Sequence, residues 1–523
     1  MAMSPKGKRR NSLILLSILV ALFVTVSGVA IVLFMQPSLF IKLLASGKLP
    51  ASGDSGIGVT ILDGEPIGIS DGSYAFDVKQ KRPGGDLKRQ ASDKFKRGDI
   101  VGAESLWEQA KKIDTNDAEV LIYLENQRVR DSGSPYITLV VGTMLTGEKR
   151  SNISTGRDNL QGAYVAQKEY NDGFKLGGGV QILLLVANSG SNKDYATTVA
   201  QQIVQAAKQD QHIVGVMGWS FSSHALKAVD VLSKAGIPMV SPTASSDELT
   251  GKSRFFFRVA PSNMRQAIVG AQYAEDQLHA RRVALFFDLK DAYSKNLAED
   301  FEKQFHYQIV AKEEYTVGKL ETLPTLLQAA LDAKPDLIYF AGYAGDMSVL
   351  LANLPTSQPY LPLMGGDALY ELNAYSDSAR VNFNHLRFTA FAYPDEWKIQ
   401  GLQEPLFFKK YPEYFDPKGQ HPSSDPYGYT RANDKVILSY DATLALLEGC
   451  KKVLTGVTPS ALRQSLAGID RSHRIQGVSG QIAFGSDGDP IDKAVLALYV
   501  DLDRHIHMAD KKGCFRVEDP CAS

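Results

Sequence analysis

From about residue 135 onward, short apolar runs alternate with amphipathic stretches. "YITLVVGTM" and "VQILLLVANSG" indicate buried strands, and "NLQGAYVAQKEYNDG" and "DYATTVAQQIVQAAKQD" indicate helices that follow them. Apolar runs of about four to eight residues that alternate with helices predict parallel sheets covered by helices. The alternation breaks and resumes at "RRVALFFDL". The sequence therefore predicts two successive α/β lobes rather than one very long sheet.

Candidate binding residues follow the ends of these predicted strands. In open α/β sheets, ligands bind at the carboxyl ends of the strands. Hydroxyl side chains gather at two such ends, in "GWSFSSHA" and in "VSPTASSDELT". Tyr293, Tyr343 and Asp367 follow predicted strands of the second run. We expect all of these side chains to border one cleft.

The chemistry of this set suits a small zwitterion. Ser222 and Ser223 begin a predicted helix, where free backbone N–H groups and the helix dipole favour a carboxylate. A carboxylate with tyrosine hydroxyls suits an ammonium group, and each charge-assisted hydrogen bond contributes roughly 1.5–3 kcal/mol. Helix capping is the commoner role for any single Ser or Asp at such a position. The joint placement at strand ends in both lobes favours a binding site.

Several of these segments together resemble one family, the type I periplasmic binding proteins, specifically the leucine/isoleucine/valine-binding family of ABC importers. The segments are "GAYVAQKEYN", "GVMGWSFSS", "GIPMVSPTASSDELT", "DLIYFAGY", "LMGGD" and "IQGVSGQIAFGSDGDP". The resemblance implies a two-lobed α/β Venus flytrap with three hinge crossings, within residues 135–515. It implies that lobe 1 comprises 135–261 and 391–475, and that lobe 2 comprises 262–390 and 476–515.

The resemblance also implies roles for single residues. Ser222 and Ser245 would hold the ligand carboxylate, and the Thr243 carbonyl and Asp367 would take the α-ammonium. The two tyrosines of the second run would close over the ligand. The complete candidate set is Ser222, Ser223, Thr243, Ala244, Ser245, Tyr293, Tyr343, Asp367 and Trp219.

The N-terminal region predicts a membrane anchor. Residues 12–36 are almost wholly apolar and follow the basic stretch "KGKRR". The run is long enough to span a hydrocarbon core of roughly 30 Å, whereas a cleaved signal peptide normally has an apolar core of about 7–15 residues. The basic flank predicts that residues 1–11 are cytoplasmic and that the binding domain is extracytoplasmic. Cleavage of the segment stays open.

Residues 37–130 join the predicted anchor to the α/β region. Residues 37–87 are rich in Gly, Ser and Asp and predict a linker, with one small hairpin near "IGVTIL". Residues 88–130 show helical periodicity and resemble the tetratricopeptide pattern. The segment is too short for a stable array, which needs about three repeats. We predict a helical hairpin that packs on its neighbour, with docking of a partner as the alternative role.

Composition narrows the function. The net charge of -1 gives no reason to expect nucleic acid as a partner. The sequence has no CxxC pair and no Cys/His cluster at metal spacing, so we expect neither metal nor cofactor. Cys514 and Cys521 could pair outside a cell or stay free. The sequence also has no Gly-x-Ser-x-Gly elbow, phosphate loop or HExxH, which argues against an enzyme.

The resemblance implies a membrane-anchored solute-binding protein of an ABC importer. Its ligand would be an amino acid, branched-chain-like, or a similar small zwitterion, and its partner an ABC permease. The alternative is a ligand sensor or regulatory receptor of the same fold, which acts through a protein partner.

Overall fold

The computed structural model describes residues 56–79, 82–355, 360–421, 427–453 and 456–517. The predicted cytoplasmic segment 1–11 and anchor 12–36 lie outside these residues. Among the helices of the described part, none combines the length and apolarity that a membrane crossing requires.

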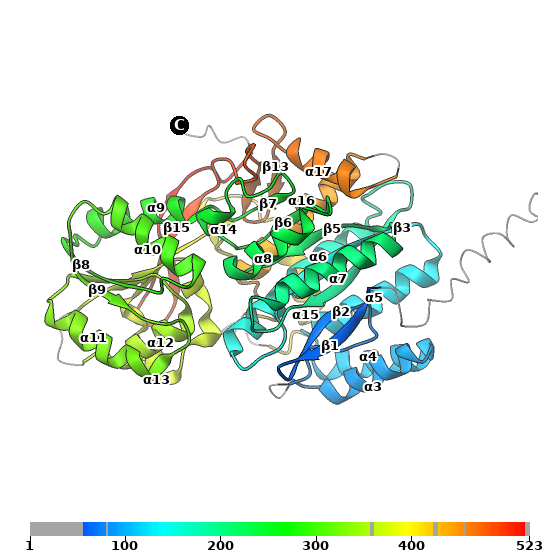
Figure 1. Cartoon of the computed structure of the whole chain (residues 1–523), viewed down its shortest axis with the longest axis horizontal. Helices are drawn as coiled ribbons and strands as arrows, with labels where there is room; N and C mark the ends of the chain where they lie inside the picture. Colours follow the sequence, from blue (N-terminus) through cyan, green and yellow to red (C-terminus); the bar gives the residue numbers. More distant parts are fainter. Residues whose placement is uncertain (1–55, 80–81, 356–359, 422–426, 454–455, 518–523) are drawn as a thin grey trace, which may run out of the picture. The chain divides into compact units, whose positions relative to one another are not determined.

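The first sheet forms the centre of lobe 1 and has seven strands in the order β1-β2-β4-β3-β5-β6-β7 (Figure 1). The strands from β3 to β7 are parallel, and the β1–β2 hairpin adds to β4 in antiparallel register. Their bounds are β1 (Gly58–Leu62), β2 (Glu65–Ser70), β3 (Tyr136–Thr143), β4 (Gln181–Asn188), β5 (Ile213–Gly218), β6 (Met239–Ser241) and β7 (Phe256–Arg258).

The helices that cover this sheet come from both ends of the chain. They are α6 (Arg150–Asp172), α7 (Tyr195–Gln209), α8 (Ser222–Leu232), α15 (Leu406–Phe415), α16 (Asp434–Lys451) and α17 (Pro459–Ala467). The short helix α14 (Glu396–Ile399) precedes α15. Helix α16 packs against α6, β5 and β6. It is apolar on most sides and buried along nearly its whole length, as expected of a helix enclosed in a core.

The second sheet forms the centre of lobe 2, in the order β16-β15-β12-β11-β10-β8-β9. Strands β8 to β12 are parallel, and β15 and β16 are antiparallel to their neighbours. The strands are β8 (Arg282–Phe287), β9 (Gln308–Glu314), β10 (Leu337–Phe340), β11 (Leu363–Gly365), β12 (Leu386–Ala390), β15 (Val495–Val500) and β16 (Ile506–Lys512). The helices are α9 (Asn263–Asp276), α10 (Ala292–Gln304), α11 (Leu323–Asp332), α12 (Ala344–Ala352) and α13 (Asp377–Arg380).

Within the described residues the chain passes between the two lobes three times. The crossings follow β7, β12 and the small hairpin of β13 (Ile475–Gly477) and β14 (Gly480–Ile482). The predicted boundary at residue 476 differs from the structure, because Ile482 and Phe484 belong to the same apolar core as Leu446 of α16. The third crossing therefore lies between Phe484 and β15.

The small hairpin predicted near "IGVTIL" is present, but it belongs to the lobe 1 sheet and not to a linker. Residues 58–70 form β1 and β2, and Ile67 and Ile69 are buried in the lobe 1 core. The glycines that suggested a linker serve the pairing of these strands. Gly68 has φ +147°, and a Cβ at this position would overlap the carbonyl oxygen of Gly58.

The segment predicted as one helical hairpin contains three helices, α3 (Gly85–Lys96), α4 (Ile100–Ile113) and α5 (Ala118–Ser132). Helices α3 and α4 pack on each other, whereas α5 packs on α6 and β4. Trp107 is fully buried, and its ring lies 5.6 Å from the rings of both Phe95 and Tyr123. We name residues 56–132 the N-terminal segment; its helices belong to the core of lobe 1.

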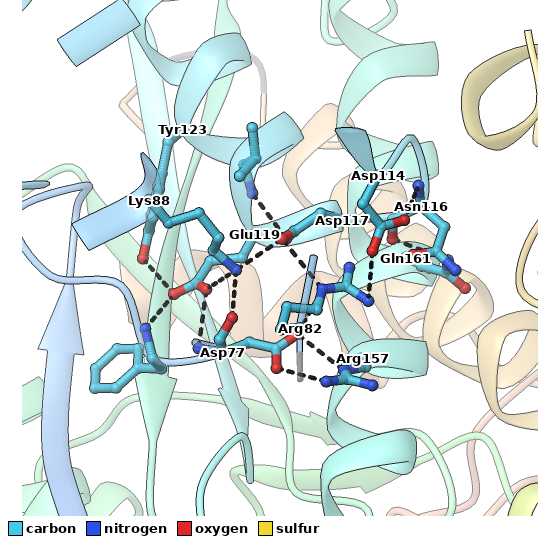
Figure 2. Close-up of polar contacts among 12 residues, drawn as sticks. Asp77, Arg82, Lys88, Asp114, Asn116, Asp117, Glu119, Tyr123, Arg157 and Gln161 are labelled. Atoms are coloured by element: carbon cyan, nitrogen blue, oxygen red, sulfur yellow. Dashed lines mark hydrogen bonds and ion pairs between the residues drawn. The ribbon is translucent and has the colours of Figure 1, made fainter. Parts of the chain in front are cut away.

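A buried ion-pair network lies inside this segment (Figure 2). The ammonium of Lys88 is 2.8 Å from Asp117 and 2.7 Å from Glu119, and it donates to the Asp77 carbonyl at 2.8 Å. Burial alone would lower the pKa of Lys88, but the neighbouring carboxylates raise it above its usual value. The side chain of Lys88 is therefore a buried cation held by anions.

The same network joins the N-terminal segment to α6. The Arg157 guanidinium of α6 donates two hydrogen bonds to Asp77, both at 2.8 Å. Arg82 lies 3.2 Å from each of Asp77, Asp114 and Asp117. Arg82 and Lys88 outweigh the effect of burial and lower the pKa of Asp117 to about 2. The interface is thus fixed by charge as well as by apolar packing.

Cys514 differs in state from Cys450. Cys514 is disulfide-bonded, and Cys450 is a free thiol buried in the core of lobe 1. Cys521 lies outside the described residues. For Cys514 the structure decides between the two alternatives that the sequence left open.

Candidate functional site

A small cavity of about 40 Å³ lies between residues of both lobes, at the carboxyl ends of the parallel strands. Hydroxyl groups line its lobe 1 side, and aromatic rings, carboxyl groups and one ammonium line the rest. The lining residues are Ser151, Thr155, Ser220, Phe221, Ser222, Thr243, Tyr293, Tyr343, Ala344, Asp367, Ala368, Glu371 and Lys435.

The lobe 1 side is built around the first turn of α8. Ser222 is the first residue of this helix, and its Oγ accepts a hydrogen bond from the Ser246 N–H at 3.1 Å. Thr243 follows β6, and its hydroxyl donates to the Ser220 carbonyl at 3.0 Å. Phe221 precedes the helix and supplies no side-chain cap. The first N–H groups of α8 are therefore left for another acceptor, which a ligand carboxylate can provide.

The lobe 2 side is built around Asp367, which follows β11. Its Oδ1 accepts from the Tyr293 hydroxyl at 3.0 Å and from Gln266 Nε2 at 3.2 Å. Burial raises the pKa of Asp367, while Lys435 and the two hydrogen bonds act in the opposite direction. No residue of the described ranges forms an ion pair with this carboxyl group. Asp367 is thus a buried carboxyl group that a cationic group of a ligand can pair with.

Two aromatic rings from opposite lobes meet at the edge of the cavity. The rings of Phe221 and Tyr343 are 5.5 Å apart, and the ring of Tyr343 is 5.4 Å from that of Tyr293. The Tyr343 hydroxyl donates to Asp291 Oδ1 at 3.1 Å. Phe221 and Tyr343 also line a second, larger cleft of about 650 Å³. The two rings therefore stand between an inner cavity and an outer cleft.

The outer cleft contains Ser223, one of the predicted ligand residues. Its hydroxyl lies 3.5 Å from Nδ1 of His224. Burial lowers the pKa of His224 to about 4, so its imidazole is neutral at pH 7. Lys149 and Lys193 line the same cleft. Ser223 thus lies at the entrance rather than at the cavity.

Three predicted ligand residues line neither space. Trp219 is fully buried, and its Nε1 donates to Ser189 Oγ at 2.9 Å. The Ala244 N–H donates to Ser241 Oγ at 3.1 Å. The Ser245 hydroxyl is fully buried and accepts from Gln266 Nε2 at 3.4 Å. Their polar groups are used inside the fold, and their role in ligand binding stays a prediction.

The candidate set that the sequence suggested omits Glu371 and Lys435, which both line the cavity. Glu371 accepts from Ser154 Oγ at 3.1 Å and Thr155 Oγ1 at 3.5 Å, so it connects lobe 2 to α6. Lys435 Nζ lies 3.3 Å from both oxygens of Asp434. One signal was present in the sequence, since two charged residues, "DK", open a helix whose next three residues are apolar.

More carboxyl groups than ammonium groups are buried here. Asp158 accepts from Asn433 Nδ2 at 2.8 Å, and its pKa is raised by burial and by Glu371. Burial also raises the pKa of Asp434 to about 7, despite the adjacent Lys435. The region favours a ligand that brings one ammonium group and further hydrogen-bond donors.

The sequence is similar to known binding proteins. Residues 137–501 match the family described as "Periplasmic binding protein". Leu/Ile/Val-binding protein homolog 3 of Brucella melitensis is 28% identical over 239 residues, which is 45% of this chain and 61% of that protein. Leu/Ile/Val-binding protein BraC3 of Rhizobium johnstonii is 29% identical over 214 residues, 40% of this chain and 56% of that protein. These matches span less than two thirds of the relatives' lengths.

Solved structures share the fold. A branched-chain amino acid transporter substrate binding protein from Streptococcus pneumoniae, in complex with isoleucine, has a TM-score of 0.60 at 20% identity. The match covers 72% of this chain and 99% of that one. A leucine binding protein from Thermotoga maritima has a TM-score of 0.60 at 21% identity, with the same coverage of 72% and 99%.

Proposed function

Because this chain belongs to the periplasmic binding protein family, we propose that it is an extracytoplasmic receptor for an amino acid or a similar small zwitterion. The family and fold are those of solute-binding proteins, not of enzymes. The observation that carries the proposal is the charge arrangement across the cavity. Uncapped N–H groups and hydroxyls lie on the lobe 1 side, and the buried, unpaired Asp367 lies on the lobe 2 side.

The ligand carboxylate would bind at the start of α8. The hydroxyls of Ser222 and Thr243 line the cavity there, and the helix dipole adds partial positive charge. The N–H of Ser246 already binds Ser222 Oγ, which fixes that hydroxyl in place. Ser245 is left out of this proposal because its hydroxyl is turned to Gln266.

The ligand ammonium would bind Asp367. Tyr293 and Gln266 hold this carboxylate in place, since both donate hydrogen bonds to the same oxygen. The rings of Phe221 and Tyr343 would then cover the ligand and exclude water, which strengthens both charge interactions. Closure of the two lobes and capture of the zwitterion would thus be one event.

Transport is the role that relatives suggest. The curated relatives are Leu/Ile/Val-binding proteins, and one structural neighbour is named as part of a branched-chain amino acid transporter. We therefore propose delivery to an ABC permease. Residues 12–36 would hold the receptor in the membrane, with residues 1–11 in the cytoplasm and the binding lobes outside.

A sensor that acts through a protein partner is the second candidate. The observation that favours it is the surface of α4, where Val101 is 79% exposed and Ile113 is 57% exposed. Exposed apolar side chains on a helix of the N-terminal segment offer a partner some contact area. Co-purification with a permease would favour transport over this alternative.

Calorimetric titration of the full chain in detergent with the twenty amino acids, simple amides and sugars tests the proposed function. We expect a subset of the amino acids to bind and to raise the thermal midpoint. A ligand at 100 times its Kd adds about 2.7 kcal/mol of stability. Binding of sugars alone would contradict the zwitterion site and leave the fold assignment intact.

A further inference from the structure

On the basis of the proposed function, we further propose that Glu371 and Lys435 form a side-chain subsite. This subsite selects an amino acid whose side chain is a neutral carboxamide, over the branched aliphatic amino acids. The argument rests on what lines the cavity, on how the two residues are held, and on which ligand charges they exclude.

The cavity offers little to an aliphatic side chain. None of the described residues that line it is Val, Leu, Ile or Met; its apolar surface comes from two alanines and from aromatic rings. Burying an aliphatic side chain favours binding where the surroundings are apolar. Here such a side chain would face Glu371 and Lys435 and would leave both without a partner in the ligand. Buried polar groups that lose water without gaining a hydrogen bond from the ligand oppose binding.

Lys435 and Glu371 border the same space without pairing to each other. Lys435 is buried and its contacts go to Asp434 on its own helix, whereas the contacts of Glu371 go to Ser154 and Thr155 of α6. An ammonium has three donors and a carboxylate has about four acceptor positions. Each therefore keeps hydrogen-bonding capacity for a ligand.

A carboxamide matches this pair because it carries one acceptor and two donors on neighbouring atoms. Its oxygen can accept from Lys435 while its nitrogen donates to Glu371. A hydroxyl offers both functions at a single atom and cannot bridge two separated groups as well. A binding site built for hydrogen bonds discriminates strongly against analogues that lack them.

Ligand side chains of either charge are disfavoured beside Lys435 and Glu371. A cationic ligand side chain would lie beside the Lys435 ammonium, which is already buried. An anionic one would lie beside Glu371, with Asp158 and Asp434 next to them. Like charges at short range in a buried site repel strongly. The neutral amide satisfies both residues without adding charge.

Calorimetry of the full chain with single amino acids tests the selectivity. We expect glutamine or asparagine to bind at least ten times more tightly than leucine, isoleucine, valine, lysine and glutamate. Tightest binding of leucine, or of a charged amino acid, would overturn the inference while leaving the proposed function in place. If no amino acid binds at all, the proposed function itself fails, and the inference fails with it.

Variants locate the selectivity in the two residues. Lys435→Met should lower the glutamine-to-leucine affinity ratio at least tenfold. Lys451→Met is the matched control, because Lys451 is an exposed residue of the same helix and forms only an ion pair with Glu448. In this variant the glutamine-to-leucine affinity ratio should stay unchanged. Glu371→Leu should also lower the ratio, and it decides the question if Lys435→Met does not fold. An unchanged ratio in the folded variants would overturn the inference.

Discussion

Asp367 is the residue on which the binding mode depends most directly. Asp367→Asn removes the negative charge opposite the ligand ammonium and keeps the size of the side chain. Leaving a buried charge unpaired costs about 3–5 kcal/mol, so we expect the affinity for amino acids to fall at least a hundredfold. Calorimetric titration of the variant measures this loss.

The matched control is Asp276→Asn, which changes an exposed acid on α9 of the same lobe. Its affinity should equal that of the wild type. Equal affinities of the Asp367→Asn variant and the wild type would show that the ammonium binds elsewhere.

Two carboxyl groups from opposite lobes share a hydrogen bond at the first crossing. Burial and Asp300 on α10 raise the pKa of Asp247 from 3.8 to about 7. The other groups that face this pair are Ser262, the Met264 N–H and Lys303, whose Nζ lies 3.0 Å from Asp300. Because the folded-state pKa is raised, the stability that the shared proton contributes is present below about pH 3.8 and is lost as pH rises through about 7.

Thermal unfolding from about pH 4 to pH 8 checks this dependence. In Asp300→Asn the amide can donate to an ionised Asp247, so the variant should depend less on pH. We expect the thermal midpoint of the wild type to fall, relative to that of the variant, as the pH rises. Parallel pH curves for the two proteins would rule out the shared proton.

Part of the site could be predicted from the sequence, for a clear reason. Ser222, Thr243, Tyr293, Tyr343 and Asp367 follow strands, and the carboxyl ends of parallel strands meet at one edge. Residues that approach from helices leave no such signal. Lys435 lies at the charged start of α16, and Glu371 lies in the turn after Asp367. Only the packing of the two lobes shows that both residues line the same cavity.

At the scale of elements, helix α3 is held to lobe 1 by charge. Lys88→Met removes the cation, so that Glu119 loses its ion pair and Asp117 keeps only its ion pair with Arg82. Breaking a buried ion pair by removing one member costs about 3–5 kcal/mol. We expect the free energy of unfolding, measured by denaturant titration, to fall by that amount.

Lys96→Met is the control for this prediction, because Lys96 is exposed in the last turn of the same helix. It should change the stability by no more than about 0.5 kcal/mol. If both variants lose the same stability, the buried network makes no special contribution.

The strands β1 and β2 show why a small hairpin can be predicted while its place in a sheet cannot. Their sequences, "GVTIL" and "EPIGIS", are short and contain glycine, which weakens the strand signal. They are strands because β4 offers an open edge and because Ile67 and Ile69 find an apolar core. Both reasons depend on parts of the chain far away in sequence, so local patterns could indicate a hairpin but not that it completes the lobe 1 sheet.

At the scale of the whole molecule, the region that matches the family does not include all of lobe 1. Removal of residues 56–134 would uncover the edge of β4 and the face of α6 that α5 covers. We expect a chain that begins at residue 135 to aggregate or to unfold at much lower denaturant than one that begins at residue 56. Expression of both, followed by denaturant titration, makes the comparison.

A soluble, equally stable chain from residue 135 would show that the N-terminal segment is dispensable for folding. The two lobes themselves could be predicted, because strongly periodic strands and helices determine an α/β architecture. The third crossing could not be placed as well, since the β13–β14 hairpin is recognised as part of lobe 1 only by its contact with α16.

The charge network of the N-terminal segment has a mechanical consequence. Residues 1–55 lead into β1, and Arg157 with Asp77 fastens the segment that follows to α6 of lobe 1. Any tether placed on residues 1–55 therefore restrains lobe 1, and reaches lobe 2 only through the three crossings. In the proposed binding cycle, lobe 1 would then stay fixed relative to the tether, and lobe 2 would move when a ligand closes the cleft. A docking partner at the same tether would then detect occupancy through the changed position of lobe 2.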